Sequence, residues 1–204
     1  PNIAHLPRPW RFVMSTVMTE VGRKYGIPED KQYVNYKAMI DAEQPDIVSV
    51  ATQPESRAEI VIYAAENGAK AIYAEKAMAA SMAEADAIVE ACERNGVFFN
   101  LGTQHRWHPG FGKMRGIIHG GRLGALETLL FRGVGLFNGA SHYYDYILFL
   151  NRDHRASWVQ MDLLDGNWSI EGDRLTGDPP GHGVIQFENG VRAYAIAPRR
   201  EIEF

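Results

Sequence analysis

Polar residues that could do chemistry stand just after three apolar segments of this chain. Thr52 follows one segment, Glu75 and Lys76 follow the next, and Arg106 follows the third. If the segments are parallel strands, their carboxyl ends share one edge of a sheet, where such folds bind cofactors and substrates. A lysine there can donate a hydrogen bond or lose its proton when desolvated, and an arginine can hold a carboxylate, a phosphate or a sugar hydroxyl. The alternative is that Glu75 and Lys76 are only solvated surface charges.

A second candidate group lies in the segment SHYYD, which opens an apolar helical pattern. Ser141 is expected to be the N-cap of this helix, and His142 then lies in the first turn. The positive end of the helix dipole favours a neutral imidazole, which is a competent general base near pH 7. Asp145, three residues on, lies on the same face and could orient the ring. The alternative is a capping histidine beside a surface aspartate.

The remaining histidines and the single cysteine give little sign of a metal centre. His105 and His108 flank Trp107, but this spacing alone is a weak zinc signal, so no metal site is expected. Cys92 is interpreted as a packing residue of a helix. Because one cysteine cannot form an internal disulfide, a reducing cytoplasm is favoured.

The composition favours a globular protein that acts on a small molecule. The chain has 204 residues, of which 46% are hydrophobic and 23% are charged, and its formal net charge is −4. Without clustered Lys and Arg, nucleic acid is not an expected partner. The sequence shows no apolar stretch of about 18 residues, so no membrane span is expected. It also shows no basic-then-apolar leader at its start.

The pattern over residues 46–102 predicts alternating strands and helices. Runs of β-branched residues bounded by glycine and by capping residues mark the elements. The expected elements are a strand at 46–52 that is buried on both faces, a helix from Pro54 to about Asn67, a strand at 70–74, a helix from Met82 to Gly96 and a strand at 97–101. Helices of this length between strands imply parallel pairing. A helix is also expected at 36–43.

After Gly102 the pattern changes to strands that follow each other more directly. The expected elements are a long strand at 123–132, a helix at 141–150, a strand at 157–164, and a hairpin of 184–188 with 191–197 around Asn189-Gly190. The fold class is therefore α/β, with a Rossmann-like parallel-sheet domain at residues 1–102. An α+β domain with an open, mostly antiparallel sheet follows at residues 103–204.

Taken together, four segments resemble the Gfo/Idh/MocA family of nicotinamide-dependent sugar and cyclitol oxidoreductases. They are the stretch from PDIVSVATQPESR to ADAIVEAC, then NLGTQHRWHPGF, GRLGALETL and SHYYDYILFL, and the similarity covers roughly residues 24–150. The family's E-K-P tripeptide is Glu75-Lys76-Ala77 here. The family's catalytic aspartate, four residues before a histidine, is Asn138 ahead of His142, so an amide replaces the acid.

The resemblance implies roles for individual residues. Lys76 would contact the reacting hydroxyl and the nicotinamide, and His142 would be the acid/base. The implied substrate-binding residues are Asn138, Asp145, Arg106 and Trp107. The implied residues for binding NAD or NADP are Thr52, Gln53, Pro54, Glu75 and Lys76. The substrate would be a carbohydrate or polyol, and the second-domain sheet would make a homo-oligomer.

One family feature is missing from the N-terminal sequence. Family members open with a glycine-rich loop that cradles the pyrophosphate, but residues 1–25 contain only Gly22 and no G-x-G-x-x-G pattern. Omitted segments, a truncated relative and a remodelled protein are three open explanations. The alternative function is accordingly a non-catalytic or truncated sugar-binding or assembly protein on the same scaffold, or an inactive fragment.

Overall fold

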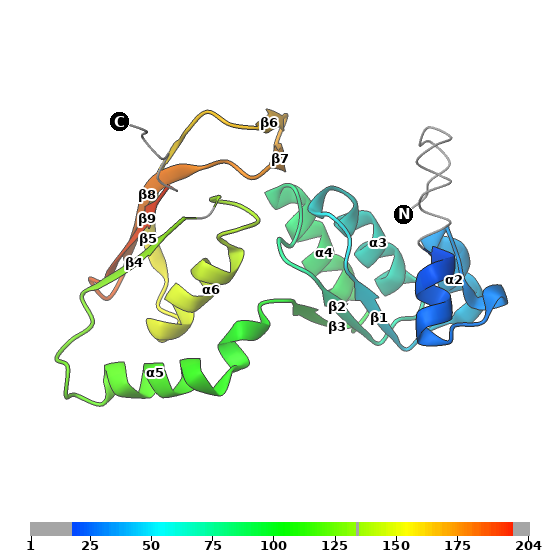
Figure 1. Cartoon of the computed structure of the whole chain (residues 1–204), viewed down its shortest axis with the longest axis horizontal. Helices are drawn as coiled ribbons and strands as arrows, with labels where there is room; N and C mark the ends of the chain where they lie inside the picture. The colour runs from blue at the N-terminus through cyan, green and yellow to red at the C-terminus, as the bar shows by residue number, and fades with distance from the viewer. Residues whose placement is uncertain (1–17, 134, 198–204) are drawn as a thin grey trace. The chain divides into compact units, whose positions relative to one another are not determined.

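The computed structural model describes residues 18–133 and 135–197, which form two compact units (Figure 1). The first unit comprises the chain up to Ala74 together with Met82–Asn100. The second comprises Glu75–Ser81 together with the chain from Leu101 onward. The segment Glu75–Ser81 therefore packs with residues that follow it by 20 or more positions, although a strand and a helix of the first unit flank it in sequence. Residues 1–17, most of the stretch in which a glycine-rich loop was expected, lie outside the described residues.

The first unit is built around a three-stranded sheet of order β1-β2-β3. After a helical segment at 18–25, its elements are η2 (Glu29–Lys31), α2 (Tyr36–Glu43), β1 (Ile47–Val50), α3 (Pro54–Glu66), β2 (Ala71–Ala74), α4 (Met82–Arg94) and β3 (Phe98–Leu101). β1 and β2 pair in parallel, from Ile47 opposite Ala71 to Val50 opposite Ala74. The predicted order of strands and helices, including the short helix at 36–43, is confirmed.

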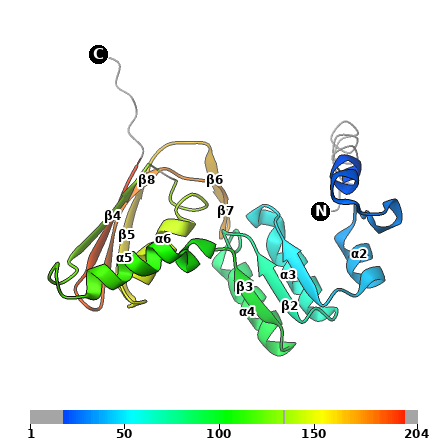
Figure 2. The same ribbon diagram turned by 60° about the horizontal axis from the view of Figure 1, so that its bottom comes forward.

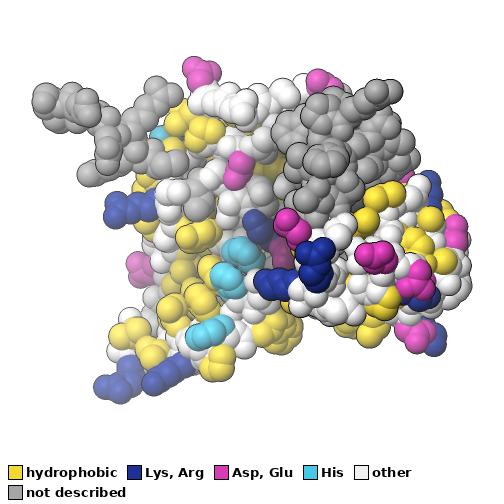
Figure 3. Space-filling view, turned by 45° about the vertical axis from the view of Figure 1, so that its right-hand side comes forward, with side chains coloured by type: hydrophobic (Ala, Val, Ile, Leu, Met, Phe, Trp, Pro, Cys, Tyr) yellow, Lys and Arg dark blue, Asp and Glu magenta, His cyan; other side chains and the backbone are white. Residues whose placement is uncertain are grey.

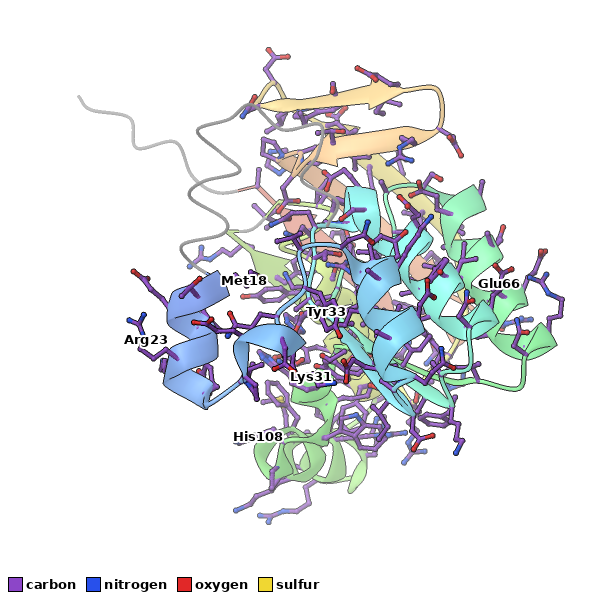
Figure 4. All side chains as sticks on the ribbon, turned by 90° about the vertical axis from the view of Figure 1, so that its right-hand side faces the viewer. Met18, Arg23, Lys31, Tyr33, Glu66 and His108 are labelled. Carbon is purple, nitrogen blue, oxygen red and sulfur yellow. The ribbon has the colours of Figure 1, made fainter. Side chains whose placement is uncertain are left out.

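Local sequence explains where the helices of this unit begin and end. The Asn35 side chain accepts hydrogen bonds from the first turn of α2, as asparagine does at an N-cap. Pro54 opens α3, where its missing N–H costs nothing. The side chains of Lys31 and Tyr33, both labelled in Figure 4, bind Glu43 at the end of α2.

The sheet of the first unit is buried on one face among the described residues. α3 packs against β1, β2 and α4. Along β1 the burial alternates: Val48 is 5% exposed, whereas Ile47 is 70% exposed. The expectation that this strand is buried on both faces is therefore wrong for the described structure, because the described helices cover only the face that carries Val48. A continuous apolar run can serve a strand with one covered face as well as one with two.

The second unit contains a four-stranded mixed sheet of order β4-β9-β8-β5. Figure 2 shows its strands β4, β5 and β8 beside α5 and α6. Its elements are η3 (Gln104–Trp107), α5 (Pro109–His119), β4 (Thr128–Arg132), α6 (Ser141–Leu150), β5 (Ala156–Leu163), β6 (Trp168–Glu171), β7 (Arg174–Gly177), β8 (Gly181–Phe187) and β9 (Arg192–Ile196). β4 runs parallel to β9, and the other two pairings are antiparallel. Phe131, Ile147, Ile185 and Phe187 belong to a core formed between α6 and this sheet. Every helix in the described ranges is too short or too polar to cross a membrane.

The sequence predicted most of this unit but missed two parts. The hairpin of β8 and β9 and the helix at 141–150 are confirmed. The long strand expected at 123–132 is wrong in its first half, because Gly124 has φ +79 and β4 begins only at Thr128. α5 was missed because its three glycines lower helix propensity. The β6–β7 hairpin was also missed; it turns at Gly172, with φ +64.

Core packing in the first unit is testable by a matched pair of substitutions on neighbouring strands. Ile72 on β2 is 1% exposed and Ile47 on β1 is 70% exposed. We expect Ile72→Ala to lower the free energy of unfolding by about 2–5 kcal/mol, since it leaves a cavity. Ile47→Ala is expected to change it by less than about 0.5 kcal/mol. Urea denaturation followed by circular dichroism measures both, and equal effects would contradict the one-sided burial.

Candidate functional site

Lys76 lies in the turn that follows β2 and belongs to the second unit. Its ammonium Nζ donates to Asn138 twice, to the side-chain Oδ1 at 2.9 Å and to the backbone oxygen at 3.1 Å. Its backbone N–H donates to Glu75 Oε2 at 3.3 Å. The peptide bond between Lys76 and Ala77 is cis. The two hydrogen bonds to Asn138 direct the Lys76 side chain at a residue 62 positions later, in the loop that precedes α6.

The loop that carries Asn138 is held by the carboxylate of Asp178. Asp178 accepts hydrogen bonds from the backbone N–H groups of Phe137, Asn138 and Gly139, at 2.8–3.0 Å. Asp178 follows β7 directly and was not singled out from the sequence. It lies 40 residues after Asn138, in a stretch without any recognisable motif. Only the position of the β6–β7 hairpin in the fold brings it to this loop.

His142 is the second residue of α6, so its place in the first turn is confirmed. The expectation that Ser141 caps this helix is wrong: Ala140 is the N-cap, and the Ser141 hydroxyl donates to the Phe137 carbonyl at 2.8 Å. The His142 ring stacks on His105, with centroids 4.2 Å apart and planes 7° from parallel. His142 Nδ1 is buried and makes no hydrogen bond within the described part of the chain.

The surroundings of His142 keep its imidazole neutral. Burial, the neighbouring His105 and the Lys76 ammonium lower the pKa of His142 below its ordinary value of 6.5, in that order. Glu75 and Asp145 act in the opposite direction but more weakly. A neutral imidazole at pH 7 can accept a proton, as expected from the position of His142 in the first turn.

Arg106 and Asp145 form an ion pair rather than two independent binding groups. Arg106 Nη2 lies 2.7 Å from Asp145 Oδ1 and 3.1 Å from Asp153 Oδ1. The structure therefore directs Asp145 to Arg106 and not to the His142 ring, as orientation of that ring would have required. The second oxygen of Asp145, Oδ2, is buried and makes no hydrogen bond to the residues that the structure describes. Trp107 is 75% exposed.

The residues expected to contact a cofactor divide between the two units. Glu75 and Lys76 lie in the second unit, and Thr52, Gln53 and Pro54 lie in the first. Thr52 follows β1, and its carbonyl accepts from Arg57. The Thr52 hydroxyl is buried and makes no hydrogen bond to any described residue. Gln53 is the N-cap of α3 and Pro54 is its first residue.

The sequence indicated His105 as a weak metal candidate and gave no sign of a pairing with His142, on which the structure stacks it. The His105 ring nitrogen Nδ1 also binds the Tyr146 hydroxyl. His108 lies at the start of α5, where its Nδ1 accepts from Gly110 N (Figure 4). Histidine side chains gather beside hydrophobic ones on the face shown in Figure 3. Within the described ranges no three His, Cys, Asp or Glu side chains form a group that could hold a metal ion.

The sequence of the first unit is similar to that of a known protein family. Residues 15–103 match the sequence model of the Gfo/Idh/MocA oxidoreductase family, described as its NAD-binding Rossmann fold. Over these residues the chain is similar to the Gfo/Idh/MocA oxidoreductase family. The parallel sheet β1-β2-β3 with α3 and α4 is accordingly part of a Rossmann-like fold.

The similar proteins include sugar and cyclitol dehydrogenases. A D-apiose dehydrogenase from Paraburkholderia graminis is 36% identical over 103 residues, which are 50% of this chain and 27% of that protein. An inositol 2-dehydrogenase from Salmonella typhimurium is 29% identical over 50% of this chain and 30% of its own length. The structure of an inositol dehydrogenase homologue from Azotobacter vinelandii, complexed with NADH and myo-inositol, superposes with a TM-score of 0.75 at 17% identity, over 88% of this chain and 52% of the other.

These matches span only part of the relatives. The matched region covers less than a third of each curated protein, and the fold match covers about half of the solved structure. The mixed sheet and α6 of the second unit lie outside the family-model match, and the structural likeness supports their fold.

The stack on His105 makes a prediction about the titration of His142. Replacing His105 with Asn removes one source of positive charge and part of the burial, so the pKa of His142 should rise toward its ordinary value. Titration of the imidazole resonances by NMR measures it, with His108→Asn as the matched control. Because the folded state favours neutral His142, its contribution to stability is complete above pH ~6.5 and is lost as the pH falls below that value. An unchanged His142 pKa in His105→Asn would contradict this account.

Proposed function

We propose that this chain is part of an NAD(P)-dependent oxidoreductase that transfers hydride between the nicotinamide and a CH–OH carbon of a sugar, sugar derivative or cyclitol. The observation that carries the proposal is the grouping of Lys76, Asn138 and His142 in one unit, with Lys76 bound to Asn138 at 2.9 Å. The names of the relatives, D-apiose dehydrogenase and inositol 2-dehydrogenase, supply the substrate class.

Each residue of this group has a chemical part in the proposed oxidation. The Lys76 ammonium donates a hydrogen bond to the oxygen of the reacting hydroxyl and stabilises the negative charge that develops there. The neutral His142 imidazole accepts the hydroxyl proton, and its lowered pKa keeps it ready to do so at pH 7. A bound nicotinamide would supply the hydride acceptor, so that the carbon bearing the reacting hydroxyl would lose a hydride and become a carbonyl carbon. In the reverse direction His142 returns the proton.

Asn138 gives the site an amide where a carboxylate is expected. Its Oδ1 accepts from Lys76, which leaves the Nδ2 group as the donor that a substrate hydroxyl can use. An amide cannot accept a proton, so all proton transfer falls to His142. This same residue favours the second candidate function, a sugar-binding or assembly protein that uses the scaffold without turnover.

The first unit offers groups that suit a dinucleotide. The Thr52 hydroxyl, buried and without a hydrogen-bond partner among the described residues, fits a ligand with hydroxyl or amide groups. We assign the cofactor contacts to Thr52, Gln53, Pro54, Glu75 and Lys76. NAD and NADP both remain in the proposal. Arg106, Trp107 and Asp145 complete the substrate-binding set, with Asp145 acting through its ion pair to Arg106.

The proposal extends to location and assembly. A cytoplasmic location suits Cys92, which is buried as a free thiol. Homo-oligomer formation through the β4-β9-β8-β5 sheet suits the apolar side chains that its face away from α6 exposes, such as Leu130 and Ile196.

Removal of either proposed catalytic side chain tests the assignment of roles. We expect Lys76→Ala and His142→Ala each to lower kcat by at least about 10²-fold with a sugar or cyclitol substrate. Lys113→Ala and His154→Ala, which change exposed residues of the same types, should stay within about twofold of the unchanged protein. Steady-state absorbance of NAD(P)H at saturating substrate measures the rates. Near-normal turnover of both catalytic-site variants would remove them from the mechanism.

Cofactor binding separates the oxidoreductase from the non-catalytic alternative. NADH or NADPH should quench the fluorescence of the four tryptophans in a saturable titration. Thr52→Val keeps the shape of the side chain but removes its hydroxyl, so we expect Kd to rise by about three- to tenfold. Thr128→Val, on an exposed position of β4, serves as the control. The absence of binding to either dinucleotide would favour the sugar-binding alternative.

A further inference from the structure

The two residues that follow β7 hold four successive backbone amides of the loop before α6. Asp178 Oδ1 accepts from Phe137 N at 2.9 Å and from Asn138 N at 3.0 Å, and its Oδ2 accepts from Gly139 N at 2.8 Å. The carbonyl of Pro179 accepts from Leu136 N at 2.7 Å. The backbone N–H groups of residues 136–139 thus all donate to Asp178 or Pro179. Three of the four hydrogen bonds end on the Asp178 carboxylate, whose charge strengthens them.

Two carbonyl groups of the same loop also accept hydrogen bonds. Tyr144 OH donates to the Leu136 oxygen at 2.9 Å, and Lys76 Nζ donates to the Asn138 oxygen at 3.1 Å. Burial, followed by the charge of Asp178, raises the pKa of Tyr144 to about 12, so this hydroxyl stays protonated and remains a donor. The loop is therefore fixed by Asp178 on its N–H side and by α6 and Lys76 on its carbonyl side.

Two glycines allow the loop to close on the carboxylate. A β-carbon built at Gly135 would lie 2.3 Å from Asp178 Cγ, which is closer than nonbonded atoms can approach. One at Gly139 would lie 3.0 Å from Asp178 Oδ2. The contact between loop and carboxylate is thus a close fit at both ends of the loop.

We propose that Asp178 is a positioning residue: its carboxylate fixes the backbone of residues 137–139 and thereby holds the Asn138 side chain against the Lys76 ammonium. Its catalytic meaning rests on the proposed function, since Asp178 acts on the reacting hydroxyl only through Asn138 and Lys76. An asparagine at 178 has a single acceptor oxygen, so it cannot receive bonds on both sides as the carboxylate does. The NH₂ group of that asparagine would face a backbone N–H of the loop, and two donors cannot form a hydrogen bond.

Amide hydrogen exchange of the full chain tests the proposal without any need for activity. In Asp178→Asn we expect the amides of Phe137, Asn138 and Gly139 to exchange at least about tenfold faster, since each loses its charged acceptor or shares one neutral oxygen. Lys76 should also be reductively methylated faster, as read by peptide mass spectrometry. Asp173→Asn, in the exposed turn between β6 and β7, is the matched control and should leave both readouts unchanged.

Two exchange patterns would overturn the proposal. Unchanged exchange at residues 137–139 in Asp178→Asn would show that the carboxylate does not fix the loop. Acceleration spread equally over β4, β8 and β9 would show that Asp178 only stabilises the unit as a whole. If Asp178→Asn fails to fold, Gly135→Ala provides the second variant, because its methyl group pushes the loop off an intact carboxylate. The same local acceleration is expected, and its absence would equally overturn the proposal.

Kinetics then separate this proposal from the proposed function. If the unchanged protein oxidises a sugar or cyclitol, Asp178→Asn should lower kcat by about 10²-fold with little change in KM, since it misplaces groups that act in the transition state. A loss confined to KM would overturn the positioning role. If the unchanged protein shows no hydride transfer while residues 137–139 still exchange faster in the variant, the proposed function fails and Asp178 keeps its positioning role.

Discussion

The hydrogen bonds from Lys76 to Asn138 are the constraint on which the second unit's site depends. They join the turn that follows β2 to a loop 62 residues later, and they bring a cation within reach of the helix that carries His142. A lysine side chain has four flexible carbons and holds a position only where acceptors fix its end. Here both oxygens of Asn138 do so. The remaining contacts of the loop serve to keep those two oxygens in place.

The electrostatics of the site follow from this arrangement. Burial, followed by His105 and the Lys76 ammonium, lowers the pKa of His142 and keeps it neutral, because a buried imidazole beside other cationic groups disfavours a positive charge. The acid that could have reversed this effect, Asp145, is engaged by Arg106 at 2.7 Å. The site thus contains a lysine donor and a neutral imidazole acceptor, the two groups that the proposed removal of a proton from a hydroxyl uses.

The sequence predicted those parts of the molecule that repeat a local pattern. The strands and helices between 46 and 101 and the helix at 141–150 follow from hydrophobic period and capping residues. Lys76 stood out because it follows a strand, and His142 because it lies in the first turn of a helix. α5 escaped because its glycines lower helix propensity, and tertiary contacts override that preference. Asp178 was not predicted for a different reason. It can accept from the backbone N–H groups of residues 137–139 only once the β6–β7 hairpin is folded, and nothing near it in sequence indicates a partner 40 residues earlier. His105 was noted in the sequence, but its stacking on His142 depends on tertiary structure and could not be predicted from local pattern.

The order of strands in the mixed sheet has a consequence for synthesis on the ribosome. β9 lies between β4 and β8, so β4 has no neighbour in this sheet until β9 has been made. Asp178 likewise emerges about a hundred residues after Lys76, which corresponds to roughly 5–20 seconds of translation. During that interval the first unit can form its local contacts. Lys76, in the turn after β2, has its partners only once the loop before α6 and the Asp178 carboxylate have been made. The second unit, which carries this site, can therefore be completed only after β9 has been made.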